Sequence, residues 1–289
     1  MPELDMDKVS IIGLGLIGGS LGLAIKKFIP GTTITGYSRS PETIAHAKKI
    51  AAIDTAAPDL KEAVHSANLV IIATPILTIK EILEHIGPHL PDKCVVTDTG
   101  STKFEIVSWA KHILPHGVSF VGGHPMAGKE VSGIIGAEAD LFKNCVYCIS
   151  PSPESGKEPL EYLKNVISRI GASPVIIAPE EHDKLIAAIS HLPFLVSEAL
   201  MSVCAGSDSW NEQARFASSG FRDVTRLASG DPAMYRDICA TNQKEINSCL
   251  DEFIKEIQKL KSLLQGNPDD LVRFFSAIRK ARQDWINKR

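Results

Sequence analysis

The stretch that decides the fold is VSIIGLGLIGGSLGLA, from Val9 to Ala24. An apolar-rich run typical of a strand leads into glycines spaced G-x-G-x-x-G, and an apolar segment suited to a helix follows. Such glycines permit a tight turn, close approach of a pyrophosphate and close packing of helix on strand, while the helix N-terminus offers free N–H groups to phosphates. The alternative is a glycine-rich turn of another α/β protein. The residues predicted to bind a dinucleotide here are Gly13, Gly15, Leu16, Ile17 and Gly18.

The bulk properties narrow the class of protein. The chain has 289 residues and a formal net charge of −3, so one or two domains are expected and no basic surface suggests a nucleic-acid partner. We find neither a signal segment nor an apolar run of about 18 residues that would cross a membrane. The six cysteines are scattered, which favours buried thiols over a metal site. A soluble, cytoplasmic protein without membrane or metal partners is the expectation.

The segment after the second predicted strand, Thr33–Tyr37, bears on the choice of cofactor. In a dinucleotide fold this position faces the adenosine ribose, where an acidic side chain would accept a hydrogen bond from the 2′-hydroxyl of NAD. Ser38 and Arg39 stand there instead, and an arginine can pair with a 2′-phosphate. NADP is therefore expected in preference to NAD, unless Arg39 is simply a solvated loop residue.

The first part of the chain alternates strand-like and helical segments. The continuous apolar run Leu69–Ala73 is typical of a buried parallel strand, and the alternation continues to Pro174–Ile177. An α/β, doubly wound parallel sheet is predicted, and ligands of such sheets bind at the carboxyl ends of the strands. Further strands are expected at Cys94–Thr97, Phe120–Val121 and Cys145–Ile149, and helices at Pro41–Lys49, Leu60–Ser66 and Ile79–Ile86. Polar turns at Thr74-Pro75, Ser101 and His124 then converge on one crevice.

The second part of the chain is helical in period. Glu180–Cys204 has a single long pattern broken only at Pro193, and no strand candidate follows Ile177. We predict two domains, residues 1–178 with the sheet and residues 179–289 all helical. Helices with such apolar stripes need a large partner surface, so a homodimer is expected. The other helices expected here are Trp210–Ser219, Met234–Leu264 and Pro268–Asn287.

Several polar residues could take part in chemistry. His124 is suited to proton transfer near neutral pH, and the glycines around it permit close approach of a substrate. Ser101 could hold that histidine, or could only cap a helix. In SSGFRDVTR, residues 218–226, arginine forks match carboxylates, although an ion pair of Asp223 with Arg222 or Arg226 is the alternative. His182, Asp183 and Lys184 are expected to form a solvated first helical turn.

Taken together, these motifs resemble the prephenate/arogenate dehydrogenases, the cyclohexadienyl dehydrogenases of tyrosine biosynthesis. The resemblance rests on GLGLIGG from Gly13, ATP from Ala73, DTGSTK from Asp98, GGHPMAG from Gly122, SHLP from Ser190, and SSGFRDVTR followed by DPAMYRDI. It implies a Rossmann dinucleotide-binding domain followed by a helical dimerisation domain, and an NAD(P)-dependent oxidative decarboxylation of prephenate, arogenate or both.

The resemblance also implies roles for single residues. His124 matches the histidine that takes the proton of the C4 hydroxyl, and Ser101 the serine that assists it. Arg226 matches the arginine that binds a substrate carboxylate, and Asp223 is expected to orient it. The remaining substrate-binding candidates are His191, Glu130 and Tyr235, and the cofactor-binding set is completed by Ser38, Arg39, Thr74 and Pro75.

Two departures from the family pattern affect specificity. Prephenate-using members often read HLPH, whereas Phe194 occupies the last position here. Together with Ser38 and Arg39, this favours an NADP-linked enzyme that accepts arogenate, with prephenate left open as a further substrate. Lys129 replaces a threonine common in the family and has no explanation in the sequence. Two other functions remain open: a β-hydroxyacid dehydrogenase that uses Lys184, and a non-catalytic NADP-binding sensor.

Overall fold

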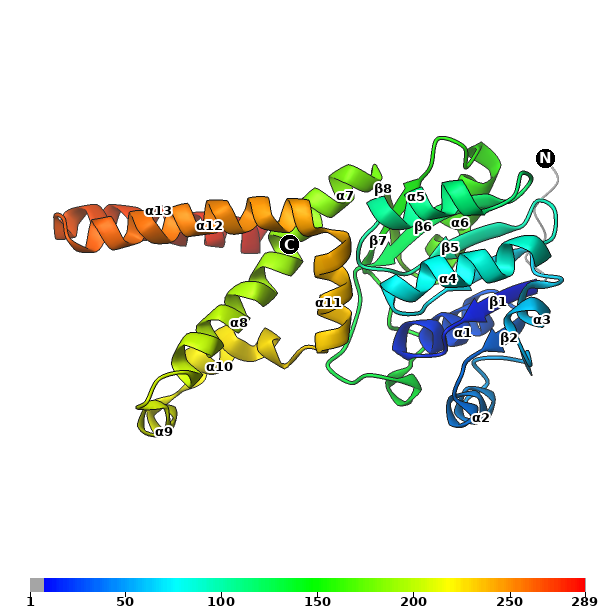
Figure 1. The fold of residues 1–289 in the computed structure, drawn as a ribbon, viewed down its shortest axis with the longest axis horizontal. Helices are drawn as coiled ribbons and strands as arrows, with labels where there is room; N and C mark the ends of the chain where they lie inside the picture. The colour runs from blue at the N-terminus through cyan, green and yellow to red at the C-terminus, as the bar shows by residue number, and fades with distance from the viewer. Residues whose placement is uncertain (1–7, 289) are drawn as a thin grey trace. The chain divides into compact units, whose positions relative to one another are not determined.

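The computed structural model describes residues 8–288, and the chain divides into two compact units, residues 1–243 and residues 244–289. The first unit contains a single sheet whose strand order is β3-β2-β1-β4-β5-β6-β7-β8 (Figure 1). The strands are β1 Lys8–Ile12, β2 Thr33–Tyr37, β3 Thr55–Ala56, β4 Leu69–Ile72, β5 Val95–Asp98, β6 Ser119–Pro125, β7 Val146–Pro151 and β8 Ser173–Ile176.

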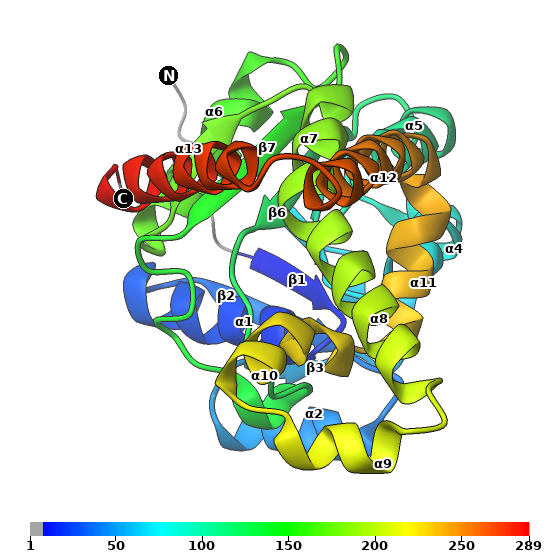
Figure 2. The same ribbon diagram turned by 90° about the vertical axis from the view of Figure 1, so that its left-hand side faces the viewer.

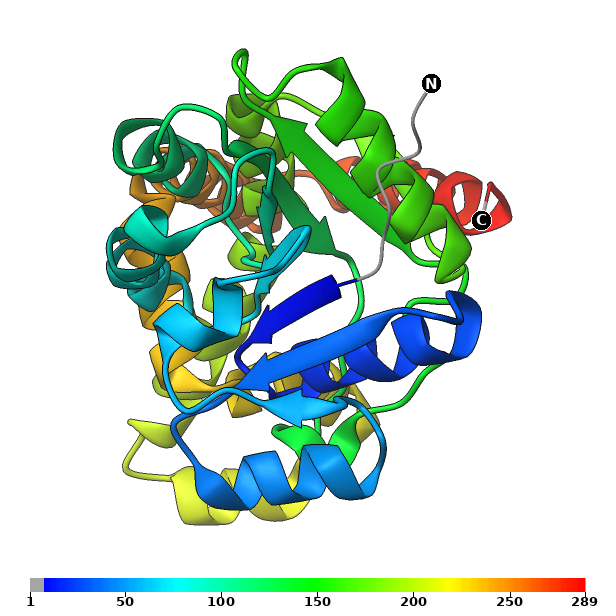
Figure 3. The same ribbon diagram turned by 90° about the vertical axis from the view of Figure 1, so that its right-hand side faces the viewer.

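The expectation of a wholly parallel sheet is wrong at one place. β6 and β7 run antiparallel, with His124 opposite Cys148, while every other neighbouring pair is parallel. The two strands are joined by the segment 126–145, which holds only a short 3-10 helix, η2 (Ile134–Gly136). Antiparallel neighbours need no helical crossover, so this segment is free to form a loop beside the site. Figure 3 shows the twist of the sheet from the blue strands to the green ones.

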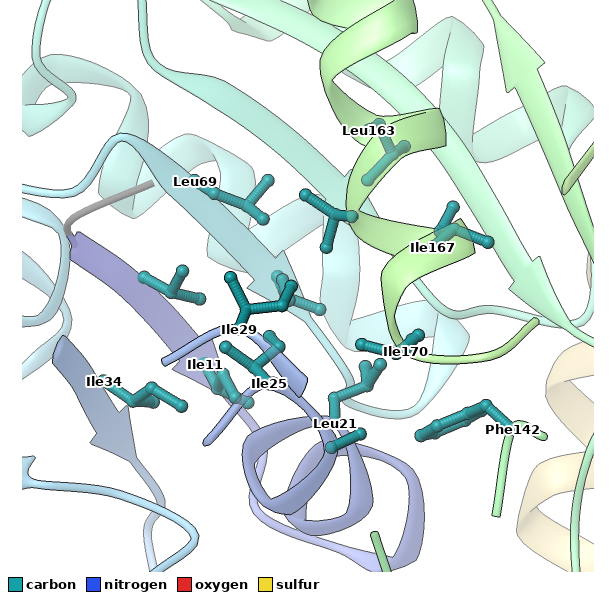
Figure 4. Packing of buried hydrophobic residues seen from close by; sticks show 14 of the residues in the cluster. Ile11, Leu21, Ile25, Ile29, Ile34, Leu69, Phe142, Leu163, Ile167 and Ile170 are labelled. Atoms are coloured by element: carbon teal, nitrogen blue, oxygen red, sulfur yellow. The ribbon is translucent and has the colours of Figure 1, made fainter. Parts of the chain in front are cut away.

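Helices cover both faces of the sheet. α1 and α6 pack on one face and α3, α4 and α5 on the other, as the buried side chains of each show. Figure 4 shows the first of these layers, in which Leu21 and Ile25 of α1 and Ile167 of α6 meet the strands. The helices of this part are α1 Leu16–Phe28, α2 Pro41–Lys49, α3 Leu60–Val64, α4 Ile76–Ile86, η1 Gly87–His89, α5 Phe104–Ile113 and α6 Lys157–Arg169.

The rest of the first unit is helical, and Figure 2 shows α10 beside α8, as their contacts confirm. Its elements are α7 Pro179–Ile186, η3 Ala187–His191, α8 Leu192–Ala205, α9 Trp210–Gln213, η4 Ala214–Phe216, α10 Ser219–Thr225, η5 Arg226–Ser229 and α11 Pro232–Thr241. α11 is tied to the sheet domain by hydrogen bonds from Leu77 N to Asp237 Oδ2, 3.3 Å, and between the hydroxyls of Thr102 and Thr241, 2.8 Å. Among the described residues no strand follows Ile176, as predicted.

The long helix predicted over Glu180–Cys204 is interrupted earlier than expected. Pro193 stands in the first turn of α8, and the irregular segment directly before it is the π-helical turn η3. Wide turns of this kind hold an extra residue and are frequent at functional sites. Two other predicted helices are also divided: Met234–Leu264 at Asn242, and Trp210–Ser219 after α9.

Contrary to expectation, one helical run is long and apolar enough to cross a membrane. Pro179–Ala205 has a mean hydropathy of 1.6 in its most apolar window. A single such helix is weak evidence, because helices in the cores of soluble proteins pass the same test. This run also contains the buried polar residues His182, Asp183 and His191.

The second unit consists of α12, Gln243–Leu264, whose first residue belongs to the first unit, and α13, Pro268–Asn287. The two helices are linked by Lys259, whose Nζ lies 5.1 Å from the centre of the Phe274 ring. Apolar side chains on both helices are exposed, which leaves this pair with surface for a further partner. They are Ile254, Ile257, Leu264, Val272, Phe275 and Ile278.

Candidate active site

The glycine turn has the geometry that its sequence predicts. Gly13 has a φ of +95°, and a Cβ there would lie 2.5 Å from the carbonyl oxygen of Ala73, so the position requires glycine. Gly15 is the N-cap of α1 and has open space on its Cβ side, where a pyrophosphate could approach. The first N–H groups of α1, from Leu16 to Gly18, have no partner within the helix. Thr74 and Pro75 follow the neighbouring strand β4 and lie at the same edge.

A cavity lies beyond the end of β2. Its volume is about 530 Å³, and its charged lining residues are Arg39 and Lys48. Ser38 also lines it, and its hydroxyl accepts a hydrogen bond from Ser40 N at 3.2 Å. No carboxylate is among the lining residues, which are Tyr37, Ser38, Arg39, Pro41, Ile44, Ala45, Lys48, Ala57 and Pro58. The lining therefore favours a ligand group with negative charge.

A buried ion pair organises the turn that carries Ser101. Asp98 and Lys103 are both fully buried and form a charge-assisted hydrogen bond. Asp98 also accepts from Gly100 N at 2.7 Å and Gly123 N at 3.1 Å, and Lys103 Nζ donates to Gly123 O at 2.7 Å. Burial lowers the pKa of Lys103, while Asp98 opposes that shift. The pair thus joins the Ser101 turn to the strand that ends in His124.

The glycines before His124 have a different purpose from the one predicted. A Cβ on Gly123 would lie 2.6 Å from Asp98 O, and one on Gly122 would lie 3.0 Å from Ser150 O. These glycines make room for neighbouring strands, not for a substrate. Gly128, on the far side of His124, does have open space around it.

His124 lies at the end of β6 and is 8% exposed. Its Nδ1 is 2.9 Å from Nε2 of His182, and the two rings meet edge to face at 67°. Burial holds the pKa of His124 well below its usual range, and the charges that His182, Lys103 and His191 can carry lower it further. A neutral imidazole in this position can accept a proton at neutral pH.

The predicted solvated turn at the head of α7 is wrong for two of its three residues. His182 is fully buried and Asp183 is 2% exposed, because α7 packs against α5. Nδ1 of His182 is 2.8 Å from Asp183 Oδ1, which also accepts from Lys103 N at 2.7 Å, while Oδ2 accepts from Phe104 N at 2.9 Å. Asp183 therefore caps α5 from another helix. Lys184 is exposed, away from these buried groups.

Ser101 does not cap α5, which was the structural alternative for this residue. The N-cap of α5 is Lys103, and the carboxylate of Asp183 satisfies the first N–H groups. Ser101 is half-buried in the turn after β5, at the carboxyl edge of the sheet. It is therefore free to bind a ligand hydroxyl.

His191 lies in the π-helical turn and is 1% exposed. The amide of Asn242 is oriented by the bond from its Nδ2 to Asp183 O, 2.8 Å, and Nδ2 is also 3.3 Å from His191 Nδ1. Nδ1 is then the acceptor, and Nε2 carries the ring hydrogen. Within the described part of the chain Nε2 has no hydrogen-bond partner, which is costly for a buried donor unless a ligand supplies one. Burial lowers the pKa of His191 to about 4.

Phe194, three residues after His191 in the sequence, pairs with Tyr235 of α11. Their rings are stacked, with centroids 3.3 Å apart and planes 4° from parallel. A Cβ on Gly230 would lie 2.5 Å from the Tyr235 ring, so the backbone comes close to this pair. The structure thus places Phe194, the departure from HLPH, in an aromatic stack.

Arg226 and Glu130 form an exposed ion pair. Arg226 Nη1 lies 3.0 Å from Glu130 Oε1, and the side chains are 58% and 80% exposed. The expected pairing with Asp223 is replaced by this contact, and Asp223 is exposed on α10. Lys129, unexplained by the sequence, pairs with Glu138 at 2.6 Å within the same loop. The loop after β6 and the helix after α10 are therefore linked by charge.

The sequence reasoning missed the residues behind His124. His182 and Asp183 were assigned to solvent, and Asp98, Lys103 and Asn242 received no role. One feature of the sequence points to Asp98 and Lys103. Both stand in DTGSTK, which is unusually polar for the end of a buried strand.

Comparisons with known proteins agree with this architecture. Residues 21–176 match the model of the prephenate dehydrogenase nucleotide-binding domain, and residues 178–277 that of the prephenate dehydrogenase dimerization domain. A curated prephenate dehydrogenase of Bacillus subtilis is 41% identical over 281 residues, which cover 96% of this chain and 75% of the relative.

Solved structures give the same result. The crystal structure of an A. aeolicus prephenate dehydrogenase with hydroxyphenyl propionate and NAD+ has a TM-score of 0.91 and 29% identity, covering 97% of this chain and 98% of that one. A Synechocystis arogenate dehydrogenase has a TM-score of 0.84 and 33% identity, covering 96% and 99%.

Proposed function

The chain belongs to the prephenate dehydrogenase family, and we propose that His124 is the base of the reaction it catalyses. The protein is an oxidoreductase of tyrosine biosynthesis that acts on prephenate, arogenate or both. The observation that carries the proposal is a buried histidine, held neutral by its surroundings, at the same sheet edge as the glycine turn.

Different residues of the chain carry out different parts of the reaction. A bound nicotinamide supplies the hydride acceptor. His124 accepts the proton of the C4 hydroxyl through Nε2, since its Nδ1 is engaged by His182. Ser101 donates to or accepts from the same hydroxyl and fixes its direction. Loss of carbon dioxide then yields the aromatic ring, so the protein mainly orients the substrate and removes one proton.

Residues of the helical part bind the remaining polar groups of the substrate. Arg226 binds a carboxylate, and the unpartnered Nε2–H of His191 donates to a second oxygen of the substrate. Glu130 sets the position of the Arg226 guanidinium, and Tyr235 contacts the substrate beside Phe194.

NADP is the proposed cofactor in preference to NAD, which the A. aeolicus relative was solved with. The support is the pair of cations, Arg39 and Lys48, beside Ser38 in a cavity lined by no carboxylate. Gly13, Gly15, Leu16, Ile17 and Gly18, with Thr74 and Pro75, hold the pyrophosphate side. Replacing Ser38 with Asp adds charge that repels a 2′-phosphate, so the preference should move toward NAD; unchanged preference would place the 2′-phosphate elsewhere.

For the substrate we propose that arogenate is accepted, with prephenate as the possible second substrate. The support is that Phe194 offers an aromatic ring in place of an imidazole and is held in its stack by Tyr235. No charge is then provided at this position for a ketoacid side chain.

The organisation of the chain supports three further proposals. The domain boundary lies after residue 178, between β8 and α7 and within two residues of the end of the first matched family model. The protein forms a homodimer through its helical part, as the dimerization-domain match and the exposed apolar residues of α12 and α13 suggest. Its location is the cytoplasm, consistent with six free cysteines.

A steady-state assay tests these proposals together. Prephenate and arogenate are each measured against NAD and NADP, with the wild type and with His124→Asn. We expect turnover with arogenate and NADP, and a loss of kcat of at least about 100-fold in the variant with unchanged cofactor binding. Full activity of His124→Asn would exclude the histidine as the base.

A further inference from the structure

The partner of His124 is a second imidazole, not a carboxylate. His182 Nε2 lies 2.9 Å from His124 Nδ1, and His182 itself is fully buried on α7. A hydrogen bond between two neutral imidazoles requires one nitrogen with a hydrogen and one without. The function of the pair therefore depends on which nitrogen of each ring carries the hydrogen.

Asp183 decides the tautomer of His182. Its Oδ1 lies 2.8 Å from His182 Nδ1, and a carboxylate can only accept, so Nδ1 of His182 carries the hydrogen and its Nε2 does not. The carboxylate is itself fixed by two backbone N–H groups, those of Lys103 at 2.7 Å and Phe104 at 2.9 Å. The tautomer of His182 thus follows from the way α7 packs on α5.

The same logic extends to His124. Because Nε2 of His182 lacks a hydrogen, His124 Nδ1 must donate to it, which leaves Nε2 of His124 with a free lone pair. We propose that His182, oriented by Asp183, is a positioning residue that holds His124 in the tautomer able to act as the base. This inference rests on the proposed role of His124.

His182 can also share the proton once it is taken. A bound oxidised nicotinamide would accept the hydrogen of C4 as hydride, while the electrons of the O–H bond form the ketone and the hydroxyl proton binds His124 Nε2. The hydrogen on His124 Nδ1 can then move to His182 Nε2, which places the positive charge beside the Asp183 carboxylate. The proton count is unchanged, and the charge moves from His124 to the ring that contacts Asp183.

The surroundings of His124 favour such a relay. The charged or titratable groups that face it are His182 from α7, His191 from η3 and Lys103 from the turn before α5. Each of these disfavours a positive charge on His124 itself, and burial does the same. Asp183, one ring further away, is the carboxylate that contacts His182, at 2.8 Å from its Nδ1.

The test uses three variants of the full-length enzyme. His182→Leu removes the acceptor, His182→Gln keeps a side chain that can accept but cannot be protonated, and Asp183→Asn offers a donor that favours the opposite tautomer of His182. The tautomer of His124 is read by 15N NMR of histidine-labelled protein, with its signals assigned by their loss in His124→Asn. His112→Leu, an exposed histidine of α5, is the matched control.

We expect the control to behave as the wild type. His182→Leu should lose the Nδ1–H tautomer of His124 and lower kcat about 100-fold, with KM within about threefold and cofactor binding unchanged. Asp183→Asn should shift His124 toward the Nε2–H tautomer, and His182→Gln should keep the tautomer and recover part of kcat. Thermal unfolding of each variant shows that it is folded.

The possible failures are distinct. If His182→Leu keeps both the Nδ1–H signal of His124 and its kcat while His124→Asn is inactive, the positioning role is wrong and the proposed function stands. If His124→Asn itself remains active, the proposed function fails, and this inference fails with it.

Discussion

The two sides of the site differ in how far their charged residues are buried. Behind His124, the charged and polar residues Asp98, Lys103, His182 and Asp183 are all buried and bound to one another or to backbone groups. On the other side, Arg226 and Glu130 meet as an ion pair with most of both side chains in solvent. Burial strengthens electrostatic interactions and raises the penalty for leaving a group unpaired, whereas exposed pairs contribute little. The proposed base is thus held rigidly, whereas Arg226, the proposed carboxylate-binding residue, is free to exchange partners.

The largest effect is expected from breaking the buried ion pair. Lys103→Met leaves Asp98 charged and buried without its partner, and the free energy of unfolding should fall by about 3–5 kcal/mol. Urea denaturation at neutral pH measures this change. Lys129→Met, which breaks the more exposed pair with Glu138, is the control and should cost less than about 1 kcal/mol. Equal losses in the two variants would remove the contrast between buried and exposed charge.

The next effect concerns pH and the buried His191. Its pKa is lowered to about 4 in the folded protein, against 6.5 for the unfolded chain, so below pH 6.5 the unfolded state binds a proton that the folded state does not. This residue should therefore reduce stability as pH falls from about 6.5 to 4, by up to about 3 kcal/mol at the lower limit. Unfolding of the wild type and of His191→Phe across this range measures it. A parallel pH dependence in both would contradict the prediction.

A somewhat smaller effect is expected for substrate binding. Arg226→Ala removes a charge-assisted bond to a substrate carboxylate, which should weaken binding by about 2–3 kcal/mol and raise KM accordingly. Steady-state kinetics measures the change, and Arg222→Ala, on the preceding helix α10, should leave KM near its original value. If KM of Arg226→Ala does not change, the arginine binds no carboxylate.

The smallest effect is expected at the partner of Arg226. Glu130→Gln breaks a solvent-exposed ion pair, so the free energy of unfolding should change by no more than about 1 kcal/mol. Chemical denaturation beside the wild type is sufficient to detect a larger loss. A loss comparable to that of Lys103→Met would mean that the loop after β6 contributes to the fold, not only to the site.

Sequence-based prediction succeeded where the signal is local and failed where burial depends on a distant part of the chain. The glycine turn and α2 were predicted because their signals are local, and the structure shows that α2 begins with a serine cap followed by a proline. β7 was predicted as a strand, but its antiparallel direction depends on a loop and not on its own residues. His182 and Asp183 were assigned to solvent because their burial comes from α5, nearly eighty residues earlier in the chain. Local patterns carry no information about such a contact.

The π-helical turn at Ala187–His191 has one more consequence. Each residue added to or removed from a helix rotates everything after it by about 100°, so the register between α7 and α8 depends on the number of residues in η3. Deleting an exposed residue there, such as Ile189, would let the segment close into a regular helix with Phe194 on nearly its present face, whereas inserting one more residue would turn Phe194 and its neighbours away from Tyr235. Homologous chains should accordingly tolerate the loss of this one residue far more readily than the gain of another.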